Sequence, residues 1–205
     1  MKLQTYIETN IIPQYAAFDK GHNIDHVRKV IEDSLSIARE YPVDIDMVYT
    51  IAAYHDIGMP KGRKEHHITS GNLLRNDKNL LQWFDDSQLQ TMQQAVEDHR
   101  ASNTYEPRSI YGKIVAEADR DISVEKIIYR TIAYGVDNYP NETLQQLKKR
   151  VHEHLKTKYG DGGYLQLWLN TEKNRRGLAK VRAVIGNESE YNTAFECMYK
   201  KFRSM

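Results

Sequence analysis

The chain has 205 residues, of which 40% are hydrophobic and 28% are charged, and this is enough for one domain with a real hydrophobic core. No run of 18 apolar residues occurs, which argues against a membrane protein, and the single cysteine excludes an intrachain disulfide and a cysteine-based metal cage. A reducing, cytoplasmic setting is therefore expected. The formal net charge of +1 gives no reason to expect duplex nucleic acid as the main partner.

The spacing of apolar residues predicts helices almost throughout the chain. Apolar residues recur at steps of three or four over 27–38, and Pro42 ends this helix. A second apolar stripe at 47–52 follows a plausible N-cap, Asp44 or Asp46, and this helix stops near Gly58.

Further helical stripes lie at 67–74, 89–99, 111–122 and 144–155. The glycine-rich stretch at 160–163 has neither the Gly-Lys-Ser/Thr ending of a phosphate-binding loop nor the Rossmann spacing, and it is interpreted as a turn. The sequence thus predicts an all-α protein organised as a single domain over residues 1–205.

Residues that can bind a metal recur where the helical pattern points inward. His55 lies four residues after Ile51 with Asp56 beside it, and Asp119 lies four after Val115. Burying an unpaired carboxylate costs several kcal/mol, and a shared cation would satisfy both aspartates.

Two histidines extend this set. His26 lies one turn before Val30, and His99 lies three residues after Val96. Two imidazoles with two carboxylates suit Mn²⁺, Fe²⁺, Co²⁺, Ni²⁺, Zn²⁺ or Mg²⁺. A single histidine on an apolar face is more often a hydrogen-bonded core residue, so the pattern alone leaves both interpretations open.

The order of these residues resembles a known family. A lone histidine (His26), the doublet His55-Asp56 within Ile-Ala-Ala-Tyr-His-Asp-Ile-Gly, and a distant Asp119 are similar to the pattern of the HD-domain superfamily of metal-dependent phosphohydrolases. Asn23 and Lys29 stand where Asp and Arg are frequent in the first motif. The resemblance implies a helical bundle around a metal-binding core at about 21–122, with additional C-terminal helices at about 140–205.

The resemblance also implies a ligand set. One divalent ion would be held by His26, His55, Asp56 and Asp119, and His67 and His99 occupy places where binuclear members carry further ligands. A second ion is therefore possible. The alternatives are that His66 and His67 are surface residues at the start of a short helix, and that His99 lies behind the ligands or faces the substrate.

Phosphate recognition requires cations near the metal. Lys61, Arg63 and Lys64 follow the His-Asp doublet, and Arg100 follows His99, although a solvated basic loop is the alternative interpretation. Residues 169–182 are similar to the C-terminal pattern of small family members that act on nucleotides, which favours a nucleotide as the small phosphorylated substrate.

For catalysis, Glu117 or Asp121 beside Asp119 would orient water or relay its proton, unless both are exposed charges on the outer helix face. The hypothesis is a metal-dependent phosphohydrolase that cleaves a phosphoester or phosphoanhydride of a nucleotide or a similar molecule. The alternatives are a non-catalytic HD-like module that binds a nucleotide and a binuclear-iron oxygenase. A homo-oligomer is also possible.

Overall fold

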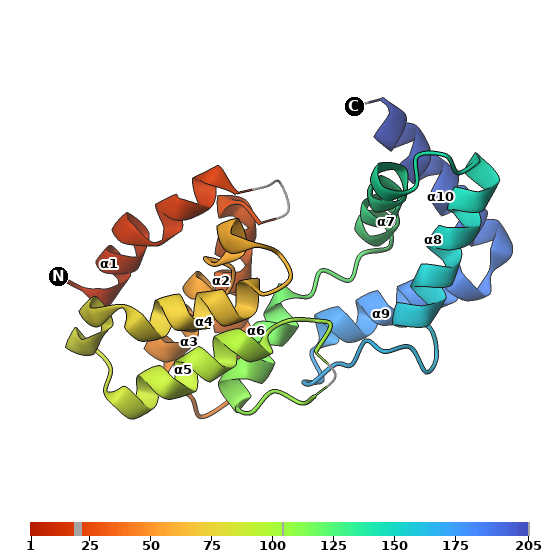
Figure 1. Ribbon diagram of the computed structural model, residues 1–205. Coiled ribbons are helices and arrows are strands. Elements are labelled where there is room, and N and C mark those ends of the chain that lie inside the picture. Colours follow the sequence, from red (N-terminus) through yellow and green to blue (C-terminus); the bar gives the residue numbers. More distant parts are fainter. Residues whose placement is uncertain (19–21, 104, 205) are drawn as a thin grey trace. The chain divides into compact units, whose positions relative to one another are not determined.

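The computed structural model describes residues 1–18, 22–103 and 105–204, and over these residues the secondary structure is helical with no strand (Figure 1). The prediction of an all-α protein is confirmed. Short 3₁₀ helices lie at Ile12–Ala17, Met59–Lys61 and Lys78–Gln82. The α-helices are α1 (Leu3–Asn10), α2 (Ile24–Ala38), α3 (Ile45–Tyr54), α4 (His66–Asn76), α5 (Asp86–Asp98), α6 (Ile110–Asp119), α7 (Val124–Asn138), α8 (Leu144–Tyr159), α9 (Glu172–Gly186) and α10 (Glu188–Arg203).

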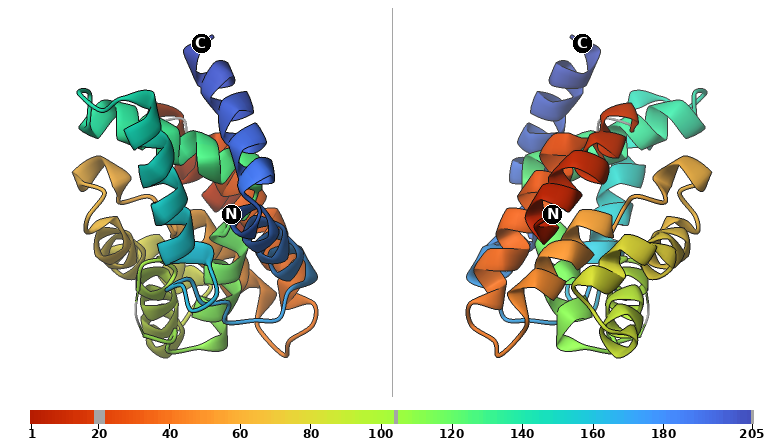
Figure 2. Two further views of the ribbon diagram at one scale, coloured as in Figure 1. Left: turned by 90° about the vertical axis from the view of Figure 1, so that its right-hand side faces the viewer. Right: turned by 90° about the vertical axis from the view of Figure 1, so that its left-hand side faces the viewer.

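The chain divides into two compact units, which Figure 2 shows from two further sides. Unit 1 comprises residues 1–120 with α1–α6, and unit 2 comprises residues 121–205 with α7–α10. The boundary falls within two residues of the end of the metal-binding core expected from the family resemblance. That the whole chain acts as a single domain stays a prediction.

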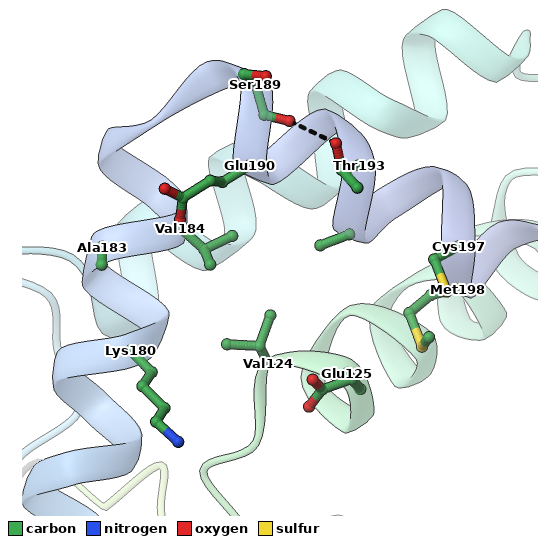
Figure 3. Close-up of a pocket in the computed structure, with 11 residues that line it drawn as sticks. Val124, Glu125, Lys180, Ala183, Val184, Ser189, Glu190, Thr193, Cys197 and Met198 are labelled. Atoms are coloured by element: carbon green, nitrogen blue, oxygen red, sulfur yellow. Dashed lines mark hydrogen bonds between the residues drawn. The ribbon is translucent and has the colours of Figure 1, made fainter.

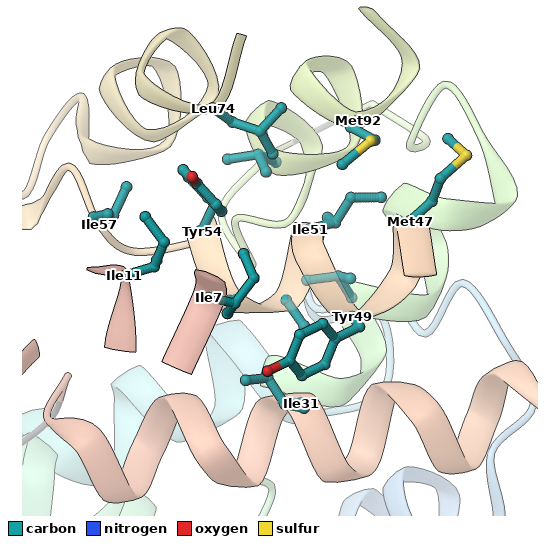
Figure 4. Packing of buried hydrophobic residues seen from close by; sticks show 14 of the residues in the cluster. Ile7, Ile11, Ile31, Met47, Tyr49, Ile51, Tyr54, Ile57, Leu74 and Met92 are labelled. Carbon is teal, nitrogen blue, oxygen red and sulfur yellow. The ribbon is translucent and has the colours of Figure 1, made fainter. Parts of the chain in front are cut away.

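Helix α3 forms the centre of unit 1. Every residue from Met47 to Tyr54 is buried, so the other helices of the unit surround α3 rather than covering one face of it. Ile51 lies among Ile7, Leu74 and Met92, which belong to α1, α4 and α5 (Figure 4). The residues that follow α3 are consequently held in the interior of the unit.

The turn after α3 approaches α4 so closely that only glycine fits at one position. A Cβ on Gly58 would lie 2.6 Å from the His66 carbonyl oxygen and 2.7 Å from the Ser70 nitrogen. The Gly58 N–H donates to Ser70 Oγ at 2.9 Å. This contact brings the start of α4 against the turn that follows α3. Helix α3 itself ends at Tyr54, four residues before the stop that the sequence predicted near Gly58.

Side chains cap the N-termini of α2, α3, α5, α6, α7, α8 and α10. Asp44, one of the two expected caps, accepts hydrogen bonds from Asp46 N and Met47 N at the start of α3. Asn23 accepts from His26 N in the first turn of α2, at 3.1 Å. Each cap satisfies backbone donors that have no partner within the helix.

Unit 2 is a small helical cluster in which α10 packs mainly along α7, and α8 contacts both α7 and α9. Its buried side chains include Val151 on α8, Val181 on α9 and Phe195 on α10. The glycine-rich stretch at 160–163 is a turn after α8, as expected, and Gly162 has a φ of 79° that favours glycine. In the part of the chain that the structure describes, no helix combines the length and apolar character that a membrane span requires.

A shared carboxylate ties α1 and α3 to the end of α4. The hydroxyls of Tyr6 and Tyr54 both donate to Asp77 Oδ2 at 2.5 Å. Burial acts to raise the pKa of Asp77, but the hydrogen bonds from Tyr54 and Tyr6 outweigh it and hold the pKa below its ordinary 3.8. The charged form is therefore the one that stabilises the fold.

Replacing Asp77 by Asn should lower the free energy of unfolding at pH 7 by about 1–3 kcal/mol, because two hydrogen bonds to a charged acceptor are weakened. A carboxylate with a lowered folded-state pKa contributes stability above the pKa of the unfolded chain and loses it as the pH falls through the folded-state value. The difference between Asp77→Asn and wild type should therefore shrink below about pH 4. Thermal denaturation at pH 7 and pH 3 measures it, with Glu40→Gln as an exposed charge control. Equal stability at pH 7 would contradict the assignment.

Candidate metal centre

Six residues that can bind a metal converge in unit 1, and each lies at or next to a helix end. Two are in the first turns of their helices, and the other four lie at or just beyond helix C-termini. The backbone N–H and C=O groups at a helix end have no partner within the helix, so polar side chains are expected there. The six residues are His26 on α2, His55 and Asp56 after α3, His66 on α4, His99 after α5 and Asp119 on α6.

One group contains the four residues expected from the sequence. His26 Nε2 lies 3.2 Å from His55 Nε2, 3.2 Å from Asp119 Oδ1 and 3.5 Å from Asp56 Oδ2. His55 Nε2 lies 3.2 Å from Asp56 Oδ2 and 3.9 Å from Asp119 Oδ1. The structure thus brings together side chains that are up to 93 residues apart in the chain.

A second group uses the other oxygen of the same aspartate. Asp56 Oδ1 lies 3.1 Å from His66 Nε2 and 3.5 Å from His99 Nε2, and these two nitrogens are 3.3 Å apart. Asp56 therefore faces one set of ligands with Oδ2 and another with Oδ1. Each set could hold a divalent ion.

The distances between donor atoms agree with those of ligands that share an ion. Ligands at about 2.1 Å from one metal lie about 3.0 Å apart at a right angle and about 3.4 Å apart at a tetrahedral angle. Except for the pair at 3.9 Å, the distances here lie between 3.1 and 3.5 Å. The imidazole and carboxylate donors fit a divalent transition metal or Mg²⁺.

Three of the histidines are oriented by the same device. The Nδ1 atoms of His55, His66 and His99 lie 2.6–2.7 Å from the backbone carbonyl oxygen three residues earlier in the chain. A carbonyl oxygen only accepts, so Nδ1 carries a proton, and Nε2 is the atom through which each ring could bind a metal. Each Nε2 faces Asp56, and such backbone partners are the usual support of metal-binding histidines.

The charges in the site stabilise one another. Burial acts to lower the pKa of His26, but hydrogen bonds to Asp119 and Asp56 outweigh it and raise the pKa to about 9. Burial likewise acts to raise the pKa of Asp56 and of Asp119, and the surrounding imidazoles, His55 and His26 foremost, hold both well below the ordinary value. Both carboxylates are therefore ionised and available to a cation.

The site is open on one side. The side chains of His55, His99 and Asp56 are 0%, 2% and 4% exposed, whereas His26 and Asp119 are 21% and 23% exposed. Solvent thus reaches the site from the side of His26 and Asp119, and the shared carboxylate of Asp56 lies on the buried side.

The buried hydroxyl of Tyr15 supports the turn that carries the doublet. It donates to the Ala53 carbonyl oxygen at 2.8 Å and accepts from Asp56 N at 3.3 Å. Burial, with the nearby charge of Asp56, raises the pKa of Tyr15 well above its ordinary value, so this hydroxyl keeps its proton. Sequence reasoning missed Tyr15, because an aromatic residue 41 positions from Asp56 has no local signal for this contact.

His66 lies where the sequence analysis expected His67. His67 is half-buried, its Nδ1 has no hydrogen-bond partner among the described residues, and burial, with the neighbouring His66, lowers its pKa to about 4. The apolar period of α4 places both histidines on the inward side, so the sequence could not separate them. The turn after α3 packs closely against the backbone of His66 at Gly58, and this packing between distant segments places His66 beside Asp56.

The basic loop after the doublet contributes mainly through its backbone. Lys61, Arg63 and Lys64 are exposed, and no contact between their side chains and the six residues is found in the described structure. The Arg63 carbonyl instead orients His66, and the Lys64 carbonyl accepts from Arg100 Nη1 at 2.6 Å. Arg100, the residue after His99, is thereby tied to the loop before α4.

The two residues expected to act on water are engaged elsewhere. Glu117 is buried and accepts from Arg120 Nη1 at 2.6 Å. Asp121 belongs to unit 2 and pairs with Lys126 at 2.6 Å. Neither carboxylate belongs to the ion-holding groups among the described residues, and their catalytic role stays a prediction without geometric support.

His66 and His67 offer a matched test of the second group, because they are adjacent imidazoles of which only one faces Asp56. We expect His66→Ala to lose one of two bound ions, His67→Ala to keep both, and Asp56→Ala to lose both, since each ligand supplies a direct bond. Metal content per chain after reconstitution with Mn²⁺ or Zn²⁺ measures this by mass spectrometry. Equal loss in the two histidine variants would contradict the second group.

Comparison with known proteins gives two curated relatives. A tRNA (cytidine(56)-2'-O)-methyltransferase of Thermoplasma volcanium is 27% identical over 161 residues, which are 74% of this chain and 46% of that protein. The protein of the same name from Picrophilus torridus is 29% identical over 145 residues, 64% of this chain and 41% of that one. The chain thus spans less than half the length of the curated relatives it matches.

Two further comparisons concern the HD fold. A solved structure from an uncultured Thermotogales bacterium, described as a predicted HD superfamily hydrolase, is 23% identical with a TM-score of 0.48 and covers 75% of this chain and 90% of that one. Residues 23–122 match the HD domain family. This match contains all six residues of the candidate metal centre and ends at the boundary between the two units. Through residues 23–122 the chain belongs to the HD-domain superfamily.

Proposed function

We propose that this protein is a metal-dependent phosphohydrolase that cleaves a phosphoester or phosphoanhydride of a nucleotide or a similar small phosphorylated molecule. The observation that carries the proposal is the carboxylate of Asp56, whose two oxygens face two groups of imidazole and carboxylate ligands at the floor of an open site. A bound divalent ion would supply Lewis-acid activation of water and polarise a phosphoryl oxygen.

The protein residues have distinct roles in this proposal. His26, His55, Asp56 and Asp119 hold one ion, and His66 and His99 with Asp56 hold another. The exposed edge formed by His26 and Asp119 is the side from which a phosphoryl group enters. The buried faces of His55 and His99 exclude bulk water from the opposite side.

The negative charge of the phosphate is met by cations at the rim. Arg100 is one candidate, because its hydrogen bond to the Lys64 carbonyl joins the residue after His99 to the basic loop. The side chains of Lys61, Arg63 and Lys64 project from the neighbouring loop into solvent and would turn toward a bound phosphate.

Two other functions are weaker. A regulatory module without activity would not need a complete ligand set, and here the set is complete and ionised. The methyl transfer in the names of the archaeal relatives describes proteins more than twice as long as the matched segment. This chain has a cluster of imidazoles and carboxylates suited to a cation, which fits hydrolysis better than methyl transfer.

Purified protein reconstituted with Mn²⁺, Co²⁺, Zn²⁺ or Mg²⁺ should release phosphate or pyrophosphate from at least one nucleoside mono- or triphosphate, and Asp56→Ala should be inactive. A coupled assay over a nucleotide panel measures this. A metal-replete protein that hydrolyses none of these nucleotides and no simple phosphoester would overturn the proposal and favour the regulatory module.

Arg100→Gln, and the triple change Lys61→Gln, Arg63→Gln and Lys64→Gln, should each lower kcat/KM about tenfold, equivalent to about 1.4 kcal/mol, mainly through KM. The backbone carbonyls that orient His66 and Arg100 remain in the triple variant, so the metal content should not change. Lys78→Gln, an exposed lysine in another part of unit 1, is the control. Loss of the metal in the triple variant would show that the loop acts on the ligands and not on the substrate.

A further inference from the structure

The two units carry opposite charge. Unit 1 has 14 lysines and arginines against 18 aspartates and glutamates, whereas unit 2 has 15 against 10. The formal charges are therefore −4 and +5, and the net charge of +1 for the whole chain conceals them. Helix α8 accounts for most of the excess, with five basic residues and one acidic residue.

Two of the hollows in the described part of unit 2 differ in character. The larger, about 540 Å³, lies between α7, α9 and α10 and is lined mainly by apolar atoms, with Glu125 and Lys180 of opposite charge at its side (Figure 3). Nothing in this hollow selects one class of ligand. The second hollow, about 390 Å³, is lined by lysines of α8.

We name this second hollow the α8 groove. Three lysines and a histidine of α8 line one side, at positions 148, 149, 152 and 156, and the junction of α9 and α10 lines the other with Ile185 and Tyr191. Residues at these spacings share one flank of a helix, and the flank is about 12 Å long from position 148 to 156. The lysines therefore form a continuous cationic stripe.

The floor of the α8 groove is rigid. The His152 ring lies 4.4 Å from the ring of Tyr191, and its Nε2 donates to the Ile185 carbonyl at 3.1 Å. The Tyr191 hydroxyl donates to the Lys148 carbonyl at 2.6 Å. These bonds join α8 to the α9–α10 junction, so the spacing of the lysines is set before any ligand arrives.

The charge of the stripe is only partly neutralised. Lys148 Nζ lies 3.4 Å from Glu196 Oε1, and Lys149 Nζ lies 3.8 Å from Glu153 Oε1, where the two side chains are 77% and 63% exposed. Pairs this exposed are worth little. Lys156 forms no ion pair among the described residues, and Glu188 is the acidic residue that lines the groove.

We propose that the α8 groove binds the phosphodiester backbone of a single-stranded nucleic acid, with Lys149 and Lys156 as the principal contacts. Lysines one to two helical turns apart meet successive phosphates, and the basic unit attracts a polyanion that the acidic unit 1 does not. A hollow of about 390 Å³ is too small to enclose a duplex, so we assign the groove to a single strand. Tyr191 is buried, so the groove offers no aromatic platform and contacts phosphates without reading bases.

The test measures binding of the full chain to a labelled 12-nucleotide single-stranded RNA by fluorescence anisotropy, in EDTA so that hydrolysis plays no part. We expect the logarithm of the affinity to fall linearly with the logarithm of salt concentration. The double variant Lys149→Gln, Lys156→Gln should bind at least tenfold more weakly at 50 mM salt and reduce the slope by about 1.4, because each lost contact to a single strand removes about 0.7.

The matched control is Lys200→Gln, Lys201→Gln, which removes the same charge from exposed positions near the end of α10, outside the groove. It should change affinity less than twofold. Single-stranded DNA of the same length should bind within about threefold of RNA, since the backbone is what is contacted. Equal losses in the two double variants, binding of RNA alone, or no binding at 50 mM salt would each overturn the proposal. Because EDTA removes the ions, these results do not depend on the proposed hydrolysis.

Discussion

The burial of one carboxylate constrains unit 1 more than any other feature. Asp56 is 3% exposed, and an ionised carboxylate in that position costs several kcal/mol unless charges and hydrogen bonds compensate. Compensation here comes from imidazoles on both of its oxygens, and from the hydroxyl of Tyr15, which accepts from its backbone nitrogen. These partners come from five segments: the 3₁₀ helix Ile12–Ala17, the start of α2, the turn after α3, the start of α4 and the end of α5. The position of Asp56 therefore constrains how these segments are arranged.

The hydrogen bonds from histidine side chains to carbonyls at the helix C-termini also orient these histidines as metal ligands. The last carbonyls of a helix have no partner within it, and His55 and His99 satisfy one each with Nδ1. That bond leaves Nε2 on the opposite side of the ring, directed at Asp56. Backbone carbonyls at the helix ends are therefore sufficient to orient these imidazoles. The packing of the other helices around the buried α3 keeps the helix ends in fixed positions relative to one another.

The division of charge suggests that the two units have different tasks. Unit 1 is acidic overall and concentrates its ionised carboxylates where a cation would neutralise them. Unit 2 is basic, and α8 presents its lysines along a groove whose floor is fixed by Tyr191 and His152. The net charge of a chain indicates its surface charge only when the charged residues are evenly distributed. Here the near-neutral total is the sum of an acidic unit 1 and a basic unit 2.

The sequence by itself determined the helical class and the start of α3 at Asp44, because periodicity and capping are local signals. The order of the motifs also predicted that His26, His55, Asp56 and Asp119 lie together. The end of α3 at Tyr54, four residues before the stop predicted near Gly58, was not determined by these local signals. Tertiary structure decided the rest. The approach of Gly58 to α4 placed His66 rather than its neighbour His67 against Asp56, and the buried pair with Arg120 engaged Glu117. The supporting hydroxyl of Tyr15 and the cationic groove on α8 likewise depend on contacts between residues that are distant in sequence. Helical period says which side of a helix faces inward, but only packing decides which neighbour a side chain meets there.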